Sequence, residues 1–301
     1  MNLSSLLARW TSLSPEARIV IVTDPAQQPI AEEIRSGSRH PVEILLFTDA
    51  KSIRPPLERL LPRDLVMALF SIDTFISAGG NRVFSPFGKP DWLPAKFAFI
   101  RLGISSASLR EGLSTPREAV YAKIDEMNRL NPSLPVRVTA PAGTDVTLRI
   151  RPFTTCSHEI TEDGGYAFLP PSETSSEIAE GTANGKIVID VTIGQLYHFG
   201  ELLGAFGLTA APITLAIRDG FITDISGGGM ADELREKLFE LPPACRKLVE
   251  LGQGLSDMQP TGLIGVDESI LSTCHFGFGD GGECGVHLDL VVSAPTIRSI
   301  R

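Results

Sequence analysis

The stretch STCHFGFGDGGECGVHLDLVVSAPTI, residues 272–297, reads as a strand, a loop rich in glycine and a second strand. His275 and His287 stand at the edges of the two apolar strands, with five glycines between them. His287 and Asp289 are two residues apart on a strand, about 7 Å along the chain, so both side chains face the same way. An imidazole and a carboxylate that converge from one surface suit a metal ion. The alternative is a surface pair on an edge strand. The apolar residues 288–292 favour a central strand, where an ionisable pair needs a partner.

Two glutamates stand out by their context. Glu173 follows Leu169-Pro170-Pro171-Ser172, which predicts that it lies on a turn fixed by proline. Glu250 lies between Leu248 and Leu251, where we expect the end of a short helical piece before a loop at residues 252–254. Read alone, each glutamate fits a surface acid as well as a ligand.

The first hundred residues alternate between apolar runs and spacers. Runs typical of strands occupy residues 19–24, 42–47, 64–71 and 96–105. Strands separated by helical or loop spacers predict a parallel sheet with crossovers, in an incomplete doubly wound layer. No glycine-rich phosphate motif follows the first run, so this half is expected to be an α/β scaffold without a nucleotide pocket.

The second half of the chain is richer in β-branched residues and turns. A helix that begins at Thr115-Pro116 and stops at Asn131-Pro132 places a domain boundary near residue 134. Strands are then expected at residues 186–193 and 212–225, and an amphipathic helix at residues 230–241. The sequence thus predicts an N-terminal parallel-sheet α/β domain, residues 1–134, and a C-terminal mixed α+β domain, residues 135–301.

Composition excludes several classes of protein. The 301 residues carry a net charge of −9, and lysine and arginine form no basic run, which disfavours nucleic-acid binding. No apolar stretch is long enough to cross a membrane, and the N-terminus lacks the pattern of a signal peptide, so a cytoplasmic location is expected. Four cysteines without a C-x-x-C motif are expected to be reduced thiols.

Several short motifs occur in an order and spacing that resemble the M29 aminopeptidases, such as aminopeptidase T and aminopeptidase S. They are Leu169-Pro170-x-x-Glu173, Asn184-Gly185-x-Ile187-Val188-x-Asp190, the segment around Glu250, Asp267-Glu268, His275 and His287-x-Asp289. The resemblance is strong from about residue 136 to residue 301. It implies an M29-like fold, in which the N-terminal α/β domain supports a C-terminal metal-binding domain.

The resemblance also implies a site and an activity. Family members bind two divalent metals, here zinc, cobalt or manganese, and act on peptides as metal-dependent hydrolases. The implied metal ligands are Glu173, Glu250, His275, His287 and Asp289, and one of the two glutamates is expected to act as a base. A homodimer is implied as well. One departure is that no tyrosine follows His275 within a few residues, where the family has one.

Two alternatives remain open from the sequence. The 2,5-dihydroxypyridine dioxygenases end in a similar H-x-D strand and use one iron(II) held by two histidines and a carboxylate. His275, His287 and Asp289 would then form the triad, with Glu173 and Glu250 supporting it. The third interpretation is a non-catalytic protein on the same scaffold that binds a peptide or a small acid.

Overall fold

The computed structural model describes residues 1–300, which form two compact units. The first unit comprises residues 1–115 and 156–172, and the second comprises residues 116–155 and the chain from residue 173 onward. This division differs from the predicted single boundary near residue 134. Helix α6 (Arg117–Asn128) buries Met127 in the core of the second unit, and the segment 156–172 returns a strand to the first unit.

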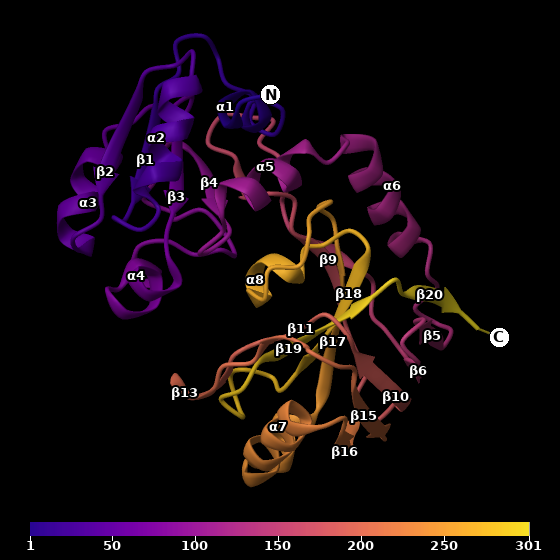
Figure 1. The fold of residues 1–301 in the computed structure, drawn as a ribbon. Helices are drawn as coiled ribbons and strands as arrows, with labels where there is room; N and C mark the ends of the chain where they lie inside the picture. The colour runs from indigo at the N-terminus through magenta and orange to yellow at the C-terminus, as the bar shows by residue number, and fades with distance from the viewer. Residues whose placement is uncertain (301) are drawn as a thin grey trace. The chain divides into compact units, whose positions relative to one another are not determined.

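The first unit contains a five-stranded parallel sheet and its helices (Figure 1). Its elements are α1 (Leu3–Leu7), β1 (Ile19–Thr23), α2 (Gln28–Gly37), β2 (Val42–Leu46), α3 (Ala50–Leu57), β3 (Leu65–Leu69), α4 (Ile72–Ser77), the 3-10 helix η1 (Gly80–Arg82), β4 (Lys96–Ile100), α5 (Ser106–Ser114) and β8 (Tyr166–Leu169). The strand order is β2-β1-β3-β4-β8. The four strands expected from the apolar runs are all present, and β8 adds a fifth that the sequence did not indicate.

Burial explains why these strands read as continuous apolar runs. Every residue of β1, β3 and β4 is buried, because side chains on both faces of the sheet are covered. On one face, Val20 and Val66 pack with Ile53 of α3 and Phe75 of α4. Strand β2, at the edge of the sheet, is less buried, with three half-buried and two exposed residues.

The second unit is built from two antiparallel sheets. Its elements are α6, β5 (Val136–Thr139), β6 (Asp145–Leu148), β7 (Thr154–Thr155), β9 (Glu173–Glu177), β10 (Asn184–Ile189), β11 (Thr192–Ile193), β12 (Leu196–His198), β13 (Glu201–Gly204), β14 (Gly207–Leu208), β15 (Ile213–Arg218), β16 (Phe221–Ser226), α7 (Gly229–Glu240), the 3-10 helix η2 (Pro243–Arg246), β17 (Leu248–Gly254), α8 (Ile264–Asp267), β18 (Thr273–Phe278), β19 (Leu288–Ser293) and β20 (Thr296–Ser299). A six-stranded sheet has the order β16-β15-β10-β6-β5-β20, and a seven-stranded sheet has the order β14-β11-β19-β18-β17-β9-β7. Strands β12 and β13 form a separate hairpin.

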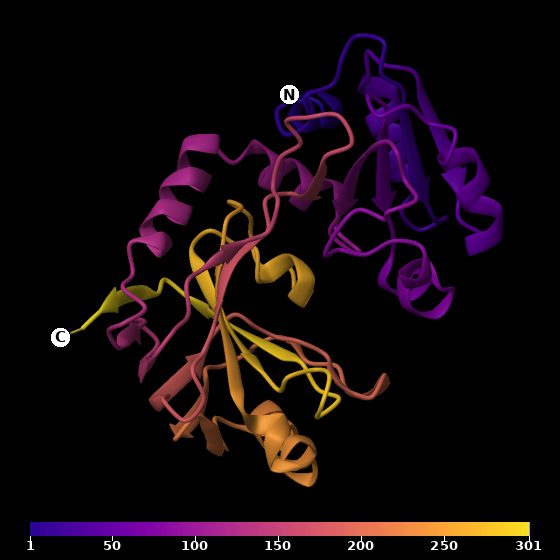
Figure 2. The ribbon, with the colours of Figure 1, turned by 180° about the vertical axis from the view of Figure 1, so that it is seen from behind.

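One apolar core lies between these two sheets. It combines side chains such as Val138 and Leu215 of the first sheet with Phe276 and Leu290 of the second. Helix α7, orange in Figure 2, contacts β15 and β16 of the six-stranded sheet. Because side chains alternate along a strand, the face of the seven-stranded sheet that turns away from this core holds a different set of residues.

The predicted fold class is confirmed: a parallel-sheet α/β unit is combined with a mixed α+β unit. The hairpin between β15 and β16 turns at Asp219 and Gly220, whose φ angles of 50° and 82° suit the tight turn expected there. All four cysteines are free. Among residues 1–300, no helix has the length and apolar character needed to cross a membrane.

Candidate metal centre

The residues expected to bind metal lie together on the seven-stranded sheet. Glu173 begins β9, Glu250 lies on β17, His275 on β18 and Asp289 on β19, and His287 immediately precedes β19. These four strands are consecutive neighbours in the sheet. Residues of alternating parity, such as Phe276 and Leu290, pack into the core, so the five polar side chains emerge on the opposite face.

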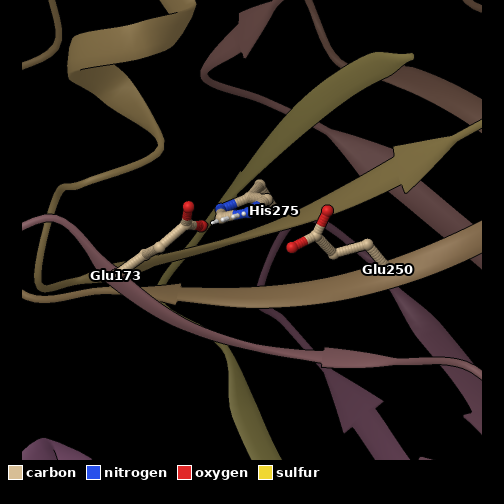
Figure 3. Close-up of side chains that lie close together, drawn as sticks. All are labelled: Glu173, Glu250 and His275. Atoms are coloured by element: carbon tan, nitrogen blue, oxygen red, sulfur yellow. Dashed lines mark ion pairs between the residues drawn. The ribbon is translucent and has the colours of Figure 1, made fainter. Parts of the chain in front are cut away.

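The first group consists of Glu173, Glu250 and His275. Figure 3 shows the two carboxylates on either side of the imidazole of His275. His275 Nε2 lies 2.8 Å from Glu173 Oε2, and the histidine is buried, with 2% of its side chain exposed. Burial lowers the pKa of His275, but the charge and close contact of Glu173, together with the charges of Asp289 and Glu268, outweigh burial and raise the pKa to about 10.

The second group consists of Glu250, His287 and Asp289. His287 Nε2 lies 3.4 Å from Glu250 Oε2 and 3.3 Å from Asp289 Oδ1. Contact with Asp289 and then with Glu250 raises the pKa of His287 to about 11. His287 Nδ1 lies 3.2 Å from the carbonyl oxygen of Gly279, which can only accept, so Nδ1 donates and Nε2 is the atom turned to the carboxylates.

Glu250 belongs to both groups. In each group, the candidate ligand atoms lie within 4.8 Å of one another. Although burial raises the pKa of Glu250, contact with His287 and the charge of His275 lower it to about 2. The hydroxyl of Ser175 contributes in the same direction. Glu250 therefore remains ionised and can present one oxygen to each group.

The hydrogen bonding within the cluster is incomplete in a way that fits a bound cation. Within residues 1–300, three buried polar atoms of the cluster have no hydrogen-bond partner: Glu173 Oε2, His275 Nδ1 and Asp289 Oδ1. Glu173 Oε2 lies 2.8 Å from His275 Nε2 and Asp289 Oδ1 lies 3.3 Å from His287 Nε2, so each oxygen forms an ion pair without a hydrogen bond. Buried polar groups are normally satisfied, so a cation among the carboxylates would supply a partner for Glu173 Oε2 and for Asp289 Oδ1.

Two glycines make room for the cluster. Gly252 of β17 pairs with His275, and a Cβ at position 252 would lie 2.0 Å from the imidazole. Gly277 of β18 pairs with Asp289, and its Cβ would lie 2.9 Å from Glu250 Cβ and 3.1 Å from Asp289 Oδ1. Both sites require a residue without a side chain, because the ligand side chains lie across them.

The structure corrects two expectations about the glutamates. Glu250 lies within strand β17, which continues through residues 252–254, rather than at the end of a helix before a loop. Glu173 is the first residue of β9 rather than part of a turn. The short run around Glu250 carries no clear helical or strand period. Its glycines suggested a loop, although Gly252 makes room for His275 and Gly254 for the backbone of Ser269 and Ile270.

The loop between the histidines shows what Asp280 does. Asp280 Oδ1 accepts hydrogen bonds from the backbone N–H groups of Glu283 and Cys284, each at 2.9 Å. This is the turn role that an aspartate adopts readily. Oδ1 of Asp280 is therefore engaged by its own loop, and the same side chain lines a cavity beside Glu250 and His287.

Comparisons with known proteins agree with this architecture. Residues 112–256 match the sequence family NicX, 2,5-dihydroxypyridine 5,6-dioxygenase, a range that includes Glu173 and Glu250. The solved structure of the 2,5-dihydroxypyridine dioxygenase from Pseudomonas putida KT2440 aligns with a TM-score of 0.62 and 18% identity, over 99% of this chain and 93% of that one. AmpT from Thermus thermophilus aligns with a TM-score of 0.58 and 14% identity, over 98% of this chain and 94% of that one.

The chain shares its fold with both proteins. No curated protein matches it by sequence. The resemblance expected from the motifs is thereby confirmed for both branches, the aminopeptidase T type and the dihydroxypyridine dioxygenase type. At these identities the likeness establishes the fold, and the reaction has to be argued from the site.

Proposed function

We propose that this chain is a metal-dependent hydrolase that removes N-terminal residues from peptides. The observation that carries the proposal is the division of the five side chains into two groups that share Glu250. The two histidines fall into different groups. This distribution suits two divalent cations with Glu250 between them better than one cation held by both histidines.

The donor set suits zinc, cobalt or manganese, since it combines imidazole nitrogen with carboxylate oxygen. When bound, two such cations would polarise a peptide carbonyl and lower the pKa of a water molecule. Glu250 would hold both cations in place, and His287 is already oriented by its contact with Gly279. One of the two glutamates would also accept the proton of the attacking water, as expected from the sequence.

The test combines metal content with peptide cleavage. We expect about two equivalents of metal per chain in the purified or reconstituted protein. Unblocked peptides should release their N-terminal residue, a chelator should abolish the release, and an added divalent metal should restore it. A broad peptide panel without cleavage, across zinc, cobalt and manganese, would contradict the hydrolase.

The second candidate is an iron(II)-dependent dioxygenase that cleaves a dihydroxylated heteroaromatic ring. It is favoured by the match of residues 112–256 to the dioxygenase family. In this case His275, His287 and Asp289 would hold one iron. Oxygen consumption with 2,5-dihydroxypyridine under iron(II), together with one equivalent of iron, would select this reaction. A protein that binds peptide without either turnover would instead be a binding module on the same scaffold.

A further inference from the structure

A cavity of about 890 Å³ adjoins the candidate metal centre. Glu250 and His287 of the second group line it. Its other charged lining residues are two cationic side chains, Arg151 and Lys247, and three carboxylates, Glu177, Glu180 and Asp280. The volume lies within the range of small-molecule sites, which place a few charged groups to orient a ligand. The side chains of Arg151 and Lys247 therefore line the same cavity as two residues of the proposed reaction centre.

The backbone of Arg151 is fixed beside β9. Its N–H donates to the carbonyl of Glu177 at 2.9 Å, and its carbonyl accepts from the hydroxyl of Ser176 at 2.6 Å. Its guanidinium is far less constrained. Nε lies 3.6 Å from Glu177 Oε2, and both side chains are largely exposed, at 70% and 83%. Glu177 in turn pairs in register with Glu250, which places Arg151 near the metal ligands.

Lys247 is anchored in the same manner. Its carbonyl accepts from the N–H of Gly279 at 2.8 Å, so it is tied to the loop that orients His287. Its ammonium group lies 3.0 Å from Glu180 Oε2, and that glutamate is 72% exposed. The backbones of Arg151 and Lys247 are thus fixed. Their charged side chains form ion pairs with two exposed carboxylates, those of Glu177 and Glu180.

Exposed ion pairs contribute little stability, because water and salt screen them. A ligand carboxylate that enters the cavity can therefore replace Glu177 or Glu180 at small cost. A guanidinium can bind such a carboxylate through two parallel hydrogen bonds, and lysine adds a point charge. The pocket is thus equipped to recognise an anionic group on a molecule whose other end reaches the metal centre.

We propose that the substrate of this site carries a free carboxylate, and that Arg151 and Lys247 bind it. This inference rests on the proposed function, because it assigns the cavity to the substrate of that centre. For a peptidase, the substrate would be a short peptide whose C-terminal carboxylate is unblocked. For a ring-cleaving enzyme, the substrate would be a dihydroxylated heteroaromatic acid rather than 2,5-dihydroxypyridine itself.

The test compares ligands that differ only in this charge. Calorimetry on the metal-loaded protein would measure the dissociation constants of a phosphinic tripeptide analogue as free acid and as C-terminal amide. A second pair, pyridine-3-carboxylic acid and its amide, distinguishes the two sources of carboxylate. We expect the acid of at least one pair to bind about tenfold or more tightly than its amide, since charged hydrogen bonds are being lost.

Arg151→Gln and Lys247→Gln should each reduce this preference and leave the binding of the amide unchanged. Arg235→Gln, which removes another exposed ion-paired arginine of the same unit, is the matched control and should keep the preference. Equal binding of acid and amide in both pairs, or a preference that survives both variants, would overturn the proposal. An acid preference in a protein that cleaves no peptide would reject the hydrolase and retain the carboxylate site.

Discussion

Gly252 and His275 occupy directly opposed positions on β17 and β18, and the imidazole lies where a side chain at position 252 would be. The most buried ligand of the cluster thus depends on the absence of a side chain on the neighbouring strand. A glycine outside the cluster therefore determines where a candidate metal ligand points. Glycine in the interior of a strand is unfavourable, so its presence here indicates a close approach.

Gly252→Ala is expected to displace the imidazole of His275, since the added Cβ would lie 2.0 Å from its ring atoms. Metal affinity should fall by about tenfold or more, as it does when the support of a ligand is lost. Gly229→Ala, where an added Cβ meets nothing within 4 Å, is the control and should bind metal normally. Isothermal titration measures both, and equal affinities would show that His275 does not need this space.

The sequence predicts those features that a local pattern of apolar or polar residues is enough to specify. The buried strands β1, β3 and β4 are continuous apolar runs, because both faces of the parallel sheet are covered. His287 and Asp289 could be placed on one face from a spacing of two residues alone, and their side chains lie 3.3 Å apart. Local periodicity carries this information directly.

The rest depended on contacts between distant segments. Strand β8 pairs with β4 across more than sixty intervening residues, and a four-residue run gives no sign of such a partner. Glu250 could not be assigned to a strand, because the glycines that follow it suggest a loop. Gly252 is required by His275, which lies on another strand. The role of each of these residues exists only in the folded sheet.

Metal stoichiometry should separate the two groups of the cluster. His275→Ala removes a ligand of one group only, so this variant is expected to retain about one of two equivalents. Glu250→Gln alters both groups and should weaken both sites by about tenfold or more. His198→Ala, which changes a histidine outside both groups, should keep the full content. If His275→Ala and Glu250→Gln lose the same amount of metal, the cluster holds a single cation.

Metal binding should release protons, because only a neutral imidazole can act as a ligand. In the metal-free protein the pKa values of His275 and His287 are raised to about 10 and about 11, so both rings are protonated near neutral pH. We expect about one proton to leave per histidine and the metal affinity to rise as pH increases from 6.5. Calorimetry in two buffers of different ionisation enthalpy measures this release. Binding without proton release would show that the rings are neutral beforehand.

The same groups give the metal-free protein a defined pH dependence of stability. A raised histidine pKa stabilises the fold fully below the ordinary value of 6.5, and the effect is lost as pH rises through about 10 to 11. The lowered pKa of Glu250 contributes stability that is fully present above pH 4.5, and this contribution is lost as the pH falls toward 2. The combined contribution should be greatest between pH 4.5 and 6.5.

The unfolding temperatures of the wild type and of His287→Gln should differ most in this window and converge at alkaline pH. A constant difference across pH would contradict the charge pairing.

Substitutions of Asp280 test whether this residue of the loop between the histidines acts through its negative charge or through the turn that it stabilises. Its Oδ1 accepts two backbone hydrogen bonds, from Glu283 and Cys284, and an asparagine can accept the same pair. Asp280→Asn should therefore leave metal affinity and turnover within about twofold of wild type, whereas Asp280→Ala loses both hydrogen bonds and should loosen the loop. The loop also presents the carbonyl of Gly279 to His287, so the alanine variant should weaken metal binding as well.

Hydrogen exchange at the N–H groups of residues 283 and 284 measures how often the loop opens, and titration measures the metal affinity. A clear loss of metal affinity in Asp280→Asn, with exchange unchanged, would show that the carboxylate charge acts on the cation or the substrate.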